Sequence, residues 1–375
     1  MPKSILSILS IIAFSCVQLN AQYLTFEHQG QNRQYILHIP QNCPPDAPLI
    51  MVMHGYSGNA NDMKNFTGFN DLADQFGFAV CYPNGTVDDY GNRFFNVGYE
   101  FHDEESVNDV DFLIQLSTYL QETHNLSPSK TFSTGFSNGS DMSYLLACEA
   151  AENFRAIAPV AGTMMQSIYD NCNSSGIPVF EIHGTADDVT LYEGDINNID
   201  GWGAYLPISD VIEFWNEANN CQNYQSESLP NLNVNDGSVI LWESYTEGIN
   251  NSEVWLYKVQ NGGHDWPGVW GNLDINASLE IWYFFSKFIN PTSSTTYTQI
   301  NPSLTISPNP GKDYFLIDGI EEGKAYNYKL LSNNGSLIES GIISTDTLNL
   351  KSTYSSGLYF LFIENTGYAK IIVEN

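Results

Sequence analysis

A serine nucleophile is the first chemistry that the sequence offers. Gly135-Phe136-Ser137-Asn138-Gly139 has the spacing G-x-S-x-G. A strand-like run, 130–134, leads into this motif and a helical stretch, 142–150, follows it. In that context the motif forms a sharp strand-to-helix turn that exposes the serine hydroxyl. Small residues are needed on both sides because the backbone is strained and the helix packs closely. The alternative is an ordinary glycine-containing turn.

A serine hydroxyl is a weak nucleophile unless a base removes its proton, so a histidine must accompany it. Of the seven histidines, His264 is the candidate: its loop, Gly262–Gly268, follows the strand-like run 254–259 and precedes the last helical stretch. The alternative is a structural loop histidine. His54 and His183 each precede a glycine at a strand end and are expected to shape turns. The others are expected in strands, an exposed loop or a helix end: His28, His38, His102 and His124.

The base needs a carboxylate on its second nitrogen, which fixes the tautomer and stabilises the imidazolium. Asp187 and Asp188 follow the strand-like run 179–182. Asp187 is preferred and Asp188 remains open; the other of the two would be a solvated turn residue. The chain order Ser137, aspartate, His264 is that of the α/β-hydrolases.

Backbone N–H groups must hold the oxyanion that forms during acyl transfer. The apolar run 49–53 ends in His54-Gly55 and continues into a loop rich in Gly and Asn. We expect the N–H of Tyr56, together with the N–H of Asn138, to form this oxyanion hole. Loss of one such donor typically costs about 3–4 kcal/mol of transition-state stabilisation.

These side chains need a framework that brings them to one edge of a sheet. Several continuous apolar runs are typical of parallel strands covered on both faces. They alternate with helical stretches around 110–120, where Asn108 or Asp109 could cap, and at 140–149 and 279–288. This alternation predicts an α/β fold with a mostly parallel sheet. The strand candidates are 35–39, 49–53, 78–82, 131–134, 156–160, 179–182 and 254–259.

The sequence predicts a second, smaller domain. Residues 291–300 form a Ser/Thr-rich linker after a catalytic domain at 22–290. Beyond the linker, 301–375 contains only short strand-like pieces separated by turn signals such as Asn334-Gly335, which predicts a small antiparallel β-sandwich. The strand candidates there are 314–317, 326–331, 337–340, 347–350, 358–363 and 369–373.

The N-terminus predicts export. Residues 1–21 contain Lys3, a short apolar run and a small residue before Gln22, the pattern of a cleavable secretory signal. A lipoprotein that uses Cys16 is the alternative, although Phe14 stands where a small residue is expected. Five cysteines remain after residue 21, so at least one thiol is free or paired between chains. We expect a secreted or cell-surface protein with no integral membrane segment, because no segment reaches about 18 apolar residues.

The charge balance excludes one class of partner. Lys and Arg number 13 and Asp and Glu number 43, which gives a net charge of −30. Such a surface repels phosphate backbones and anionic lipid, so nucleic-acid binding is not expected.

Asp195, Asn197 and Asp200 imitate a calcium loop, but no glutamate closes it at the required spacing. We therefore expect neither a metal nor another cofactor.

Taken together, the motifs resemble the poly(3-hydroxybutyrate) depolymerase-like and feruloyl esterase group of secreted serine esterases. The resemblance covers about 30–288 and rests on five segments: 49–55, 135–139, 158–162, 183–187 and 262–268. It implies that Ser137 is the nucleophile, Asp187 the acid and His264 the base. It also suggests a Cys148–Cys172 disulfide, worth about 3 kcal/mol. The sequence departs from the family at Ser140-Asp141, where a second glycine is common.

The C-terminal segment resembles a different family. Ile306-Ser307-Pro308-Asn309-Pro310, Gly357-Leu358-Tyr359-Phe360-Leu361 and Lys370-Ile371-Ile372-Val373 are similar to the sorting domain of type IX secretion substrates in Bacteroidota. This resemblance implies that the type IX secretion machinery is a partner and that the domain is removed after passage across the outer membrane. A carbohydrate-binding module would have a similar strand pattern and is the alternative.

The most specific reading is a secreted serine esterase that acts through an acyl-enzyme. Its substrate would be a polyester similar to poly-3-hydroxybutyrate, feruloyl or acetyl esters of plant polysaccharide, or small acyl esters. Trp202, Trp266 and Trp270 could line an aromatic cleft for the substrate, or could simply pack in the core. The alternative functions are a serine peptidase of the same fold and a non-catalytic surface-binding protein on a hydrolase scaffold.

Overall fold

The computed structural model describes residues 23–289, 304–321, 323–332, 335–351, 354–363 and 366–374. The expected signal segment and the linker at 291–300 lie outside these ranges, as does Cys16. Within them, no helix is both long enough and apolar enough to cross a membrane.

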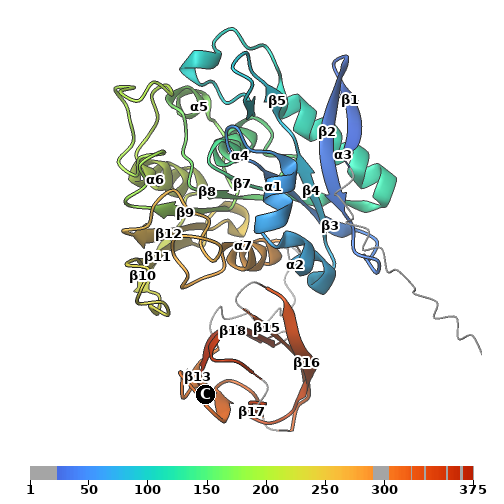
Figure 1. The fold of residues 1–375 in the computed structure, drawn as a ribbon, viewed down its shortest axis with the longest axis vertical. Coiled ribbons are helices and arrows are strands. Elements are labelled where there is room, and N and C mark those ends of the chain that lie inside the picture. Colours follow the sequence, from blue (N-terminus) through green and yellow to red (C-terminus); the bar gives the residue numbers. More distant parts are fainter. Residues whose placement is uncertain are drawn as a thin grey trace, which may run out of the picture.

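A ten-stranded sheet forms the centre of the larger part of the described chain (Figure 1). Its order is β1-β2-β4-β3-β7-β8-β9-β12-β11-β10. The six strands from β4 to β12 in that order run parallel, and two antiparallel strands extend the sheet at each side. This confirms the predicted α/β class. The strands are β1 Leu24–His28, β2 Gln31–His38, β3 Ala47–Met53, β4 Ala79–Pro83, β7 Leu126–Phe136, β8 Ala156–Val160, β9 Val179–Gly184, β10 Asn223–Ser228, β11 Val239–Thr246 and β12 Val254–Gln260.

Helices cover both faces of this sheet, which is why β3, β4, β8 and β9 are buried along their whole length. Two apolar clusters fill the spaces between sheet and helices. On one face lie α3 Asp109–His124, α4 Asn138–Glu149, α5 Gln166–Asn171 and α6 Ile208–Asn219; on the other lie α1 Ala60–Phe66, α2 Phe69–Phe76 and α7 Ala277–Ser286. The short strands β5 Thr86–Val87 and β6 Arg93–Phe94 form a separate hairpin, and 3-10 turns span Glu100–His102 and Ile249–Asn251.

The predicted helix near 110–120 is α3, and it begins directly after Asn108, one of the two predicted caps. Asn108 is the N-cap of α3, and its side chain accepts the N–H of Asp111 at 2.9 Å. The helix ends at Asn125, which adopts a left-handed conformation. An N-cap side chain such as that of Asn108 satisfies an N–H group that the first turn leaves without an intrahelical partner.

The C-terminal part consists of antiparallel sheets, as the strand pattern predicts. One sheet has the order β13-β14-β17 and the other β16-β15-β18-β19, around a core that includes Phe315, Leu330 and Leu361. The strands are β13 Ile306–Ser307, β14 Tyr314–Ile317, β15 Tyr326–Ser332, β16 Leu337–Ile343, β17 Thr347–Asn349, β18 Gly357–Ile363 and β19 Gly367–Val373.

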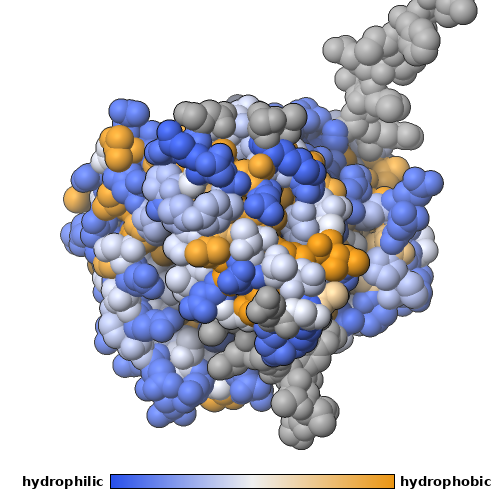
Figure 2. Space-filling view, turned by 90° about the horizontal axis from the view of Figure 1, so that it is seen from below, coloured by the Kyte–Doolittle hydropathy of each residue, from blue (hydrophilic) through white to orange (hydrophobic). Residues whose placement is uncertain are grey.

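This C-terminal part packs beneath α2 and α7 (Figure 1). The rings of Phe76 and Phe362 lie 5.4 Å apart, and the ammonium group of Lys329 donates to the carbonyl of Gln75. Seen from below, the visible surface is mainly hydrophilic, with hydrophobic residues scattered over it (Figure 2).

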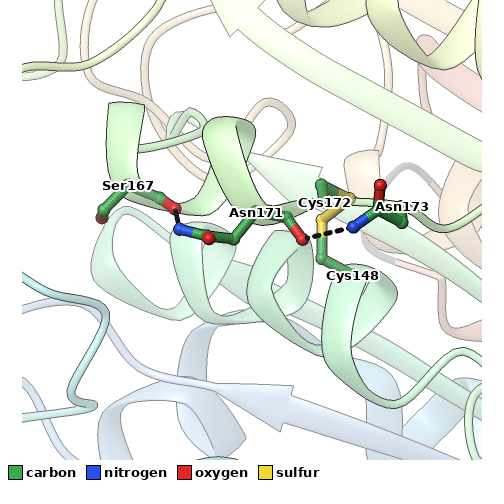
Figure 3. Close-up of a disulfide and its surroundings, with 5 residues drawn as sticks. All are labelled: Cys148, Ser167, Asn171, Cys172 and Asn173. Carbon is green, nitrogen blue, oxygen red and sulfur yellow. Dashed lines mark hydrogen bonds between the residues drawn. A yellow bond between two sulfur atoms is a disulfide. The ribbon is translucent and has the colours of Figure 1, made fainter.

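The disulfide implied by the family resemblance is present. Cys148 near the end of α4 is bonded to Cys172 just after α5, with a Cα–Cα distance of 4.9 Å (Figure 3). The bridge closes the segment that contains β8 and α5. Among the described residues, the remaining cysteines are free thiols: Cys43, Cys81 and Cys221. Burial raises the pKa of the Cys81 thiol well above its usual value, as expected for a packed, unreactive cysteine.

Candidate active site

Ser137 lies in the sharp turn between β7 and α4. Its backbone angles, φ 56° and ψ −119°, are strained for a residue with a side chain. The two flanking glycines explain how the turn is possible. A Cβ on Gly135 would lie 2.5 Å from the backbone of Gly139, and a Cβ on Gly139 would lie 2.5 Å from the carbonyl oxygen of Met53. The turn therefore has the geometry expected for an exposed nucleophile.

His264 and Asp187, separated by 77 positions, meet in the structure. Nδ1 of His264 lies 2.8 Å from Oδ2 of Asp187. The other carboxylate oxygen of Asp187 accepts the N–H groups of Val189 and Thr190, both at 2.8 Å. Asp187 is 4% exposed, whereas Asp188 is exposed to solvent. Of the two aspartates, only Asp187 contacts the histidine, so the geometry favours Asp187 as the acid.

The imidazole of His264 also lies beside the turn that carries Ser137. Its ring centre is 4.7 Å from that of Phe136, the residue before the serine. The described structure shows no hydrogen bond between the Ser137 hydroxyl and His264. In hydrolases without substrate this contact is often long and tightens in the substrate complex. Serine, histidine and aspartate thus lie at one edge of the sheet, beyond the carboxyl ends of β7, β9 and β12.

The expected oxyanion-hole residues lie next to the serine. A Cβ on Gly55 would lie 3.2 Å from Cβ of Ser137, so the loop after β3 packs directly on the turn. Asn138 is held by two hydrogen bonds to the backbone of Phe95, at 2.7 and 2.9 Å. Among the described residues, no acceptor takes the backbone N–H of either Asn138 or Tyr56. Both N–H groups are therefore available to a substrate oxygen.

His54 holds the loop after β3 through contacts with the backbone. His54 accepts the N–H of Gly85 at Nε2, at 3.0 Å, so its proton is on Nδ1 and is donated to the carbonyl of Gly55 at 2.8 Å. Burial lowers the pKa of His54 to about 4, so this imidazole is neutral near pH 7. The expectation of a turn-shaping role for His54 agrees with these contacts.

The expectation that His102 lies in an exposed loop is wrong. His102 is 3% exposed, and its Nε2 lies 3.0 Å from the carboxylate of Asp88. The same carboxylate accepts the hydroxyl of Tyr56 at 2.7 Å. Burial and this hydrogen bond raise the pKa of Tyr56 to about 12. The pair of Asp88 and His102 thus fixes the side chain of Tyr56, and no local sequence signal marks this pair.

A buried polar network lies behind Asp187. Nε2 of His183 lies 2.8 Å from the carbonyl of Thr190, and its Nδ1 lies 3.0 Å from the carboxylate of Glu181. Tyr144 donates its hydroxyl to the same carboxylate at 2.8 Å. Burial raises the pKa of Glu181 to about 7, against the opposing effect of His183. Burial lowers the pKa of His183, but Glu181 and Asp187 outweigh this and the pKa is raised.

Asp141, where the sequence departs from the family pattern, is a buried carboxyl group close to Ser137. Its oxygens accept the N–H of Thr163 at 2.8 Å and the hydroxyl of Tyr99 at 2.7 Å. Burial raises the pKa of Asp141 to about 6, despite these hydrogen bonds and the charge of His264. The group is therefore both a structural anchor and a source of pH dependence.

The three tryptophans expected near the substrate occupy different environments. Trp202 lines a small pocket together with Ser137. Trp270 is half-buried, and its indole N–H donates to the carbonyl of His264 at 3.4 Å. Trp266 is fully buried and donates to the hydroxyl of Ser278 at 3.1 Å, so its environment is that of a core residue.

No metal site is formed in the part of the chain that the structure describes: no group of three His, Cys, Asp or Glu side chains could hold an ion. The carboxylate of Asp195 accepts the N–H of Asp200 at 2.9 Å. Such bonds to backbone N–H groups lower the pKa of Asp195. In the loop that imitates a calcium site, backbone N–H groups of the loop itself thus occupy the carboxylate of Asp195.

A strained serine at a strand-to-helix turn of a mostly parallel sheet, with a histidine and an aspartate beside it, defines an α/β-hydrolase. Comparison with known families is more specific. Residues 34–211 match the family described as esterase PHB depolymerase, and residues 305–374 match the secretion system C-terminal sorting domain. Both resemblances inferred from the sequence motifs are thereby confirmed.

Individual relatives are esterases too. The chain is 26% identical over 288 residues to a bifunctional acetylxylan esterase/xylanase of Neocallimastix patriciarum. The alignment covers 73% of this chain and 37% of the relative. It is 30% identical over 179 residues to a probable feruloyl esterase C of Aspergillus flavus, covering 45% of this chain and 60% of the relative. The chain thus spans less than two thirds of either relative.

Among solved structures, an acetyl xylan esterase from Aspergillus awamori has the same fold. The TM-score is 0.51 at 15% identity, over 70% of this chain and 98% of that one. At this identity the likeness concerns the fold alone.

Proposed function

We propose that this protein is a secreted serine carboxylic ester hydrolase with Ser137 as nucleophile, His264 as base and Asp187 as acid. The observation that carries the proposal is the contact of 2.8 Å between Nδ1 of His264 and Oδ2 of Asp187, beside a strained serine. Because Nδ1 donates to the carboxylate, Nε2 is left as the proton acceptor. The family match at residues 34–211 supports the same chemistry.

The reaction proceeds in two acyl-transfer steps. His264 takes the proton of Ser137 as its oxygen attacks the ester carbonyl, and the N–H groups of Asn138 and Tyr56 hold the oxyanion. The protonated imidazole then donates its proton to the oxygen of the leaving group. The alcohol departs, and the acyl group stays on Ser137 as an acyl-enzyme. Water, activated by the same histidine, hydrolyses this intermediate and regenerates the serine.

The substrate classes follow from the relatives and the predicted export. Polyesters similar to poly-3-hydroxybutyrate, feruloyl esters and acetyl esters of polysaccharide are all insoluble or extracellular targets that suit an exported enzyme. We propose that residues 22–290 form the catalytic domain. Residues 301–375 form a sorting domain that the type IX secretion machinery recognises, in agreement with the match at 305–374.

The experiment is hydrolysis of p-nitrophenyl acetate by the purified chain and by Ser137→Ala. We expect the substitution to reduce kcat by several orders of magnitude, because the acyl-enzyme cannot form. Ser129→Ala, in the exposed part of β7, is the matched control and should keep full activity. Full activity of Ser137→Ala would overturn the proposal.

Two measurements separate the alternatives. Turnover of p-nitrophenyl acetate without turnover of matched p-nitroanilide peptides distinguishes an esterase from a peptidase. Covalent labelling by a fluorophosphonate, lost in His264→Ala, distinguishes either enzyme from a non-catalytic binding protein.

A further inference from the structure

Ser137 opens onto a small, partly open pocket whose other walls come from distant parts of the chain. The volume open to the centre of a water-sized sphere is about 20 Å³. On this measure, about 10–15 Å³ holds one water molecule. The pocket thus has room for a group of about one or two non-hydrogen atoms. The residues that matter for its shape are Tyr99, Asp141, Thr163, Met165, Trp202 and Tyr205.

The polar part of the wall is held by Asp141. Tyr99 is 4% exposed and donates its hydroxyl to this carboxyl group at 2.7 Å. Thr163 donates its N–H to the same group at 2.8 Å and its hydroxyl to the carbonyl of Leu206 at 2.8 Å. Asp141 thus ties the first turn of α4 to two other segments of the wall.

The apolar part of the wall is equally constrained. The ring of Trp202 lies 5.1 Å from that of Tyr99 and 5.5 Å from that of Tyr56, in edge-to-face contacts. The methyl group of Met165 lies so close to Gly203 that a Cβ there would be 2.9 Å from it. Tyr205 accepts the N–H of Leu191 at 3.2 Å. Enlarging the pocket would require these contacts to break.

We propose that this pocket is the acyl subsite and that it restricts the enzyme to acetyl esters; this inference rests on the proposed function. In an acyl-enzyme the acyl group stays on the serine while the alcohol departs. A small pocket that the nucleophile itself lines suits the group that stays. A polymer chain cannot enter a space of about 20 Å³, so a polymeric substrate lies outside as the alcohol part.

The acyl groups of the candidate substrates differ in what they need from this pocket. An acetyl group places one methyl group beyond the carbonyl carbon. A hydroxybutyryl group places three carbons and a hydroxyl there, and a feruloyl group adds an aromatic ring. Only the acetyl group fits the available space. The structure therefore points to O-acetylated polysaccharide, rather than polyester or feruloylated polysaccharide, as the substrate class.

The test compares kcat/KM of the full chain on p-nitrophenyl acetate, butyrate and octanoate. One methylene group in such a pocket changes discrimination by about 10- to 200-fold. We expect at least a 10-fold preference for acetate over butyrate and no measurable turnover of octanoate. Met165→Ala and Trp202→Ala enlarge the pocket and should each raise the butyrate-to-acetate ratio about 10-fold. Tyr224→Ala, exposed on β10, is the control and should leave the ratio unchanged.

The outcomes separate this inference from the proposed function. If the wild-type chain hydrolyses butyrate as well as acetate, and Ser137→Ala abolishes both activities, the subsite inference is wrong and the serine esterase stands. If the folded wild-type chain hydrolyses none of the three esters, both fall. The wild-type chain-length series is decisive by itself, so the inference stays testable even if an enlarged variant does not fold.

Discussion

Nε2 of His183 lies 3.5 Å from Oδ2 of Asp187, the same oxygen that lies 2.8 Å from Nδ1 of His264. Two imidazoles thus lie near the same oxygen of one buried carboxylate. The carbonyl of Thr190 accepts the proton of Nε2 of His183 at 2.8 Å, and the Asp187 carboxylate lies farther away, at 3.5 Å. We expect His183, buried beside Asp187, to help to hold the acid of the proposed triad in place.

This relationship predicts the kinetic effect of His183→Asn. The substitution removes the donor to Thr190 and leaves the buried Glu181 carboxyl group with the Tyr144 hydroxyl but without the imidazole. We expect kcat/KM on p-nitrophenyl acetate to fall about 10- to 100-fold, because displacement of a catalytic group by about 1 Å has effects of this order. The loss should be in kcat, with KM nearly unchanged, because substrate binding does not involve His183.

The control for this prediction is His124→Asn. His124 is exposed in the last turn of α3, and its replacement should leave both constants unchanged. An unchanged kcat in a folded His183→Asn protein would show that Asp187 is positioned by its own backbone contacts alone.

Much of the framework could be predicted because its signals are local. The strand 156–160 is a short buried run and is found with its predicted bounds, and Asn108 caps α3. Neither β10 nor β11 is among the predicted strands. All six residues of β10, Asn223–Ser228, are exposed, so no apolar pattern marks the strand. It exists through its pairing with β11, a contact that only the folded chain creates.

The candidate site, too, was predictable only in its local features. The order of Ser137, Asp187 and His264 is visible in the sequence, because each follows a strand. The surrounding contacts are not visible, because they form only in three dimensions. Glu181 contacts His183, which lies beside Asp187. Asp88 contacts both His102 and the hydroxyl of Tyr56. Likewise, sequence alone could not separate Trp266 in the core from Trp202 at the pocket.

Asp141 predicts how the free energy of unfolding depends on pH. Burial raises its pKa from 3.8 to about 6, so the folded chain binds this proton more tightly than the unfolded chain does. The resulting stabilisation is complete below about pH 3.8 and is lost as the pH rises through about 6. The difference of about two pKa units corresponds to about 3 kcal/mol. Asp141→Asn keeps the shape and removes the titration.

We therefore expect the stability of Asp141→Asn relative to wild type to be about 3 kcal/mol more favourable at pH 8 than at pH 4. Urea denaturation of both proteins at the two pH values measures this difference. Asp188→Asn is the control, because Asp188 is exposed and its replacement should give the same difference at both pH values. A constant difference for Asp141→Asn as well would contradict the burial of a titrating carboxyl group there.

The close approach of α4 to β3 predicts the effect of Gly139→Ala. The added Cβ would lie 2.5 Å from the carbonyl oxygen of Met53, a backbone atom that cannot move aside by rotation. We expect a loss of about 1–3 kcal/mol in the free energy of unfolding, typical of overpacking. Displacement of the Asn138 N–H should also lower kcat. Thermal denaturation and ester kinetics measure the two effects.

A matched glycine provides the control. A Cβ on Gly263 would meet only the side chain of Asp265, at 3.4 Å, which is ordinary contact. Gly263→Ala should therefore leave the melting temperature unchanged. Equal melting temperatures for Gly139→Ala and wild type would mean that α4 can retreat from β3 without penalty.

The disulfide supports the final prediction. Cys148 and Cys172 are separated by 24 positions, and a loop of this size, once closed, reduces the conformational freedom of the unfolded chain. Replacing both with serine should lower the free energy of unfolding by about 3 kcal/mol. Denaturation without reductant measures this loss, and Cys43→Ser, which removes a free thiol, is the control. Because neither cysteine lines the pocket at Ser137, the folded double variant should retain the kcat of wild type. A lower kcat in that variant would mean that the bridge also holds the first turn of α4 in place.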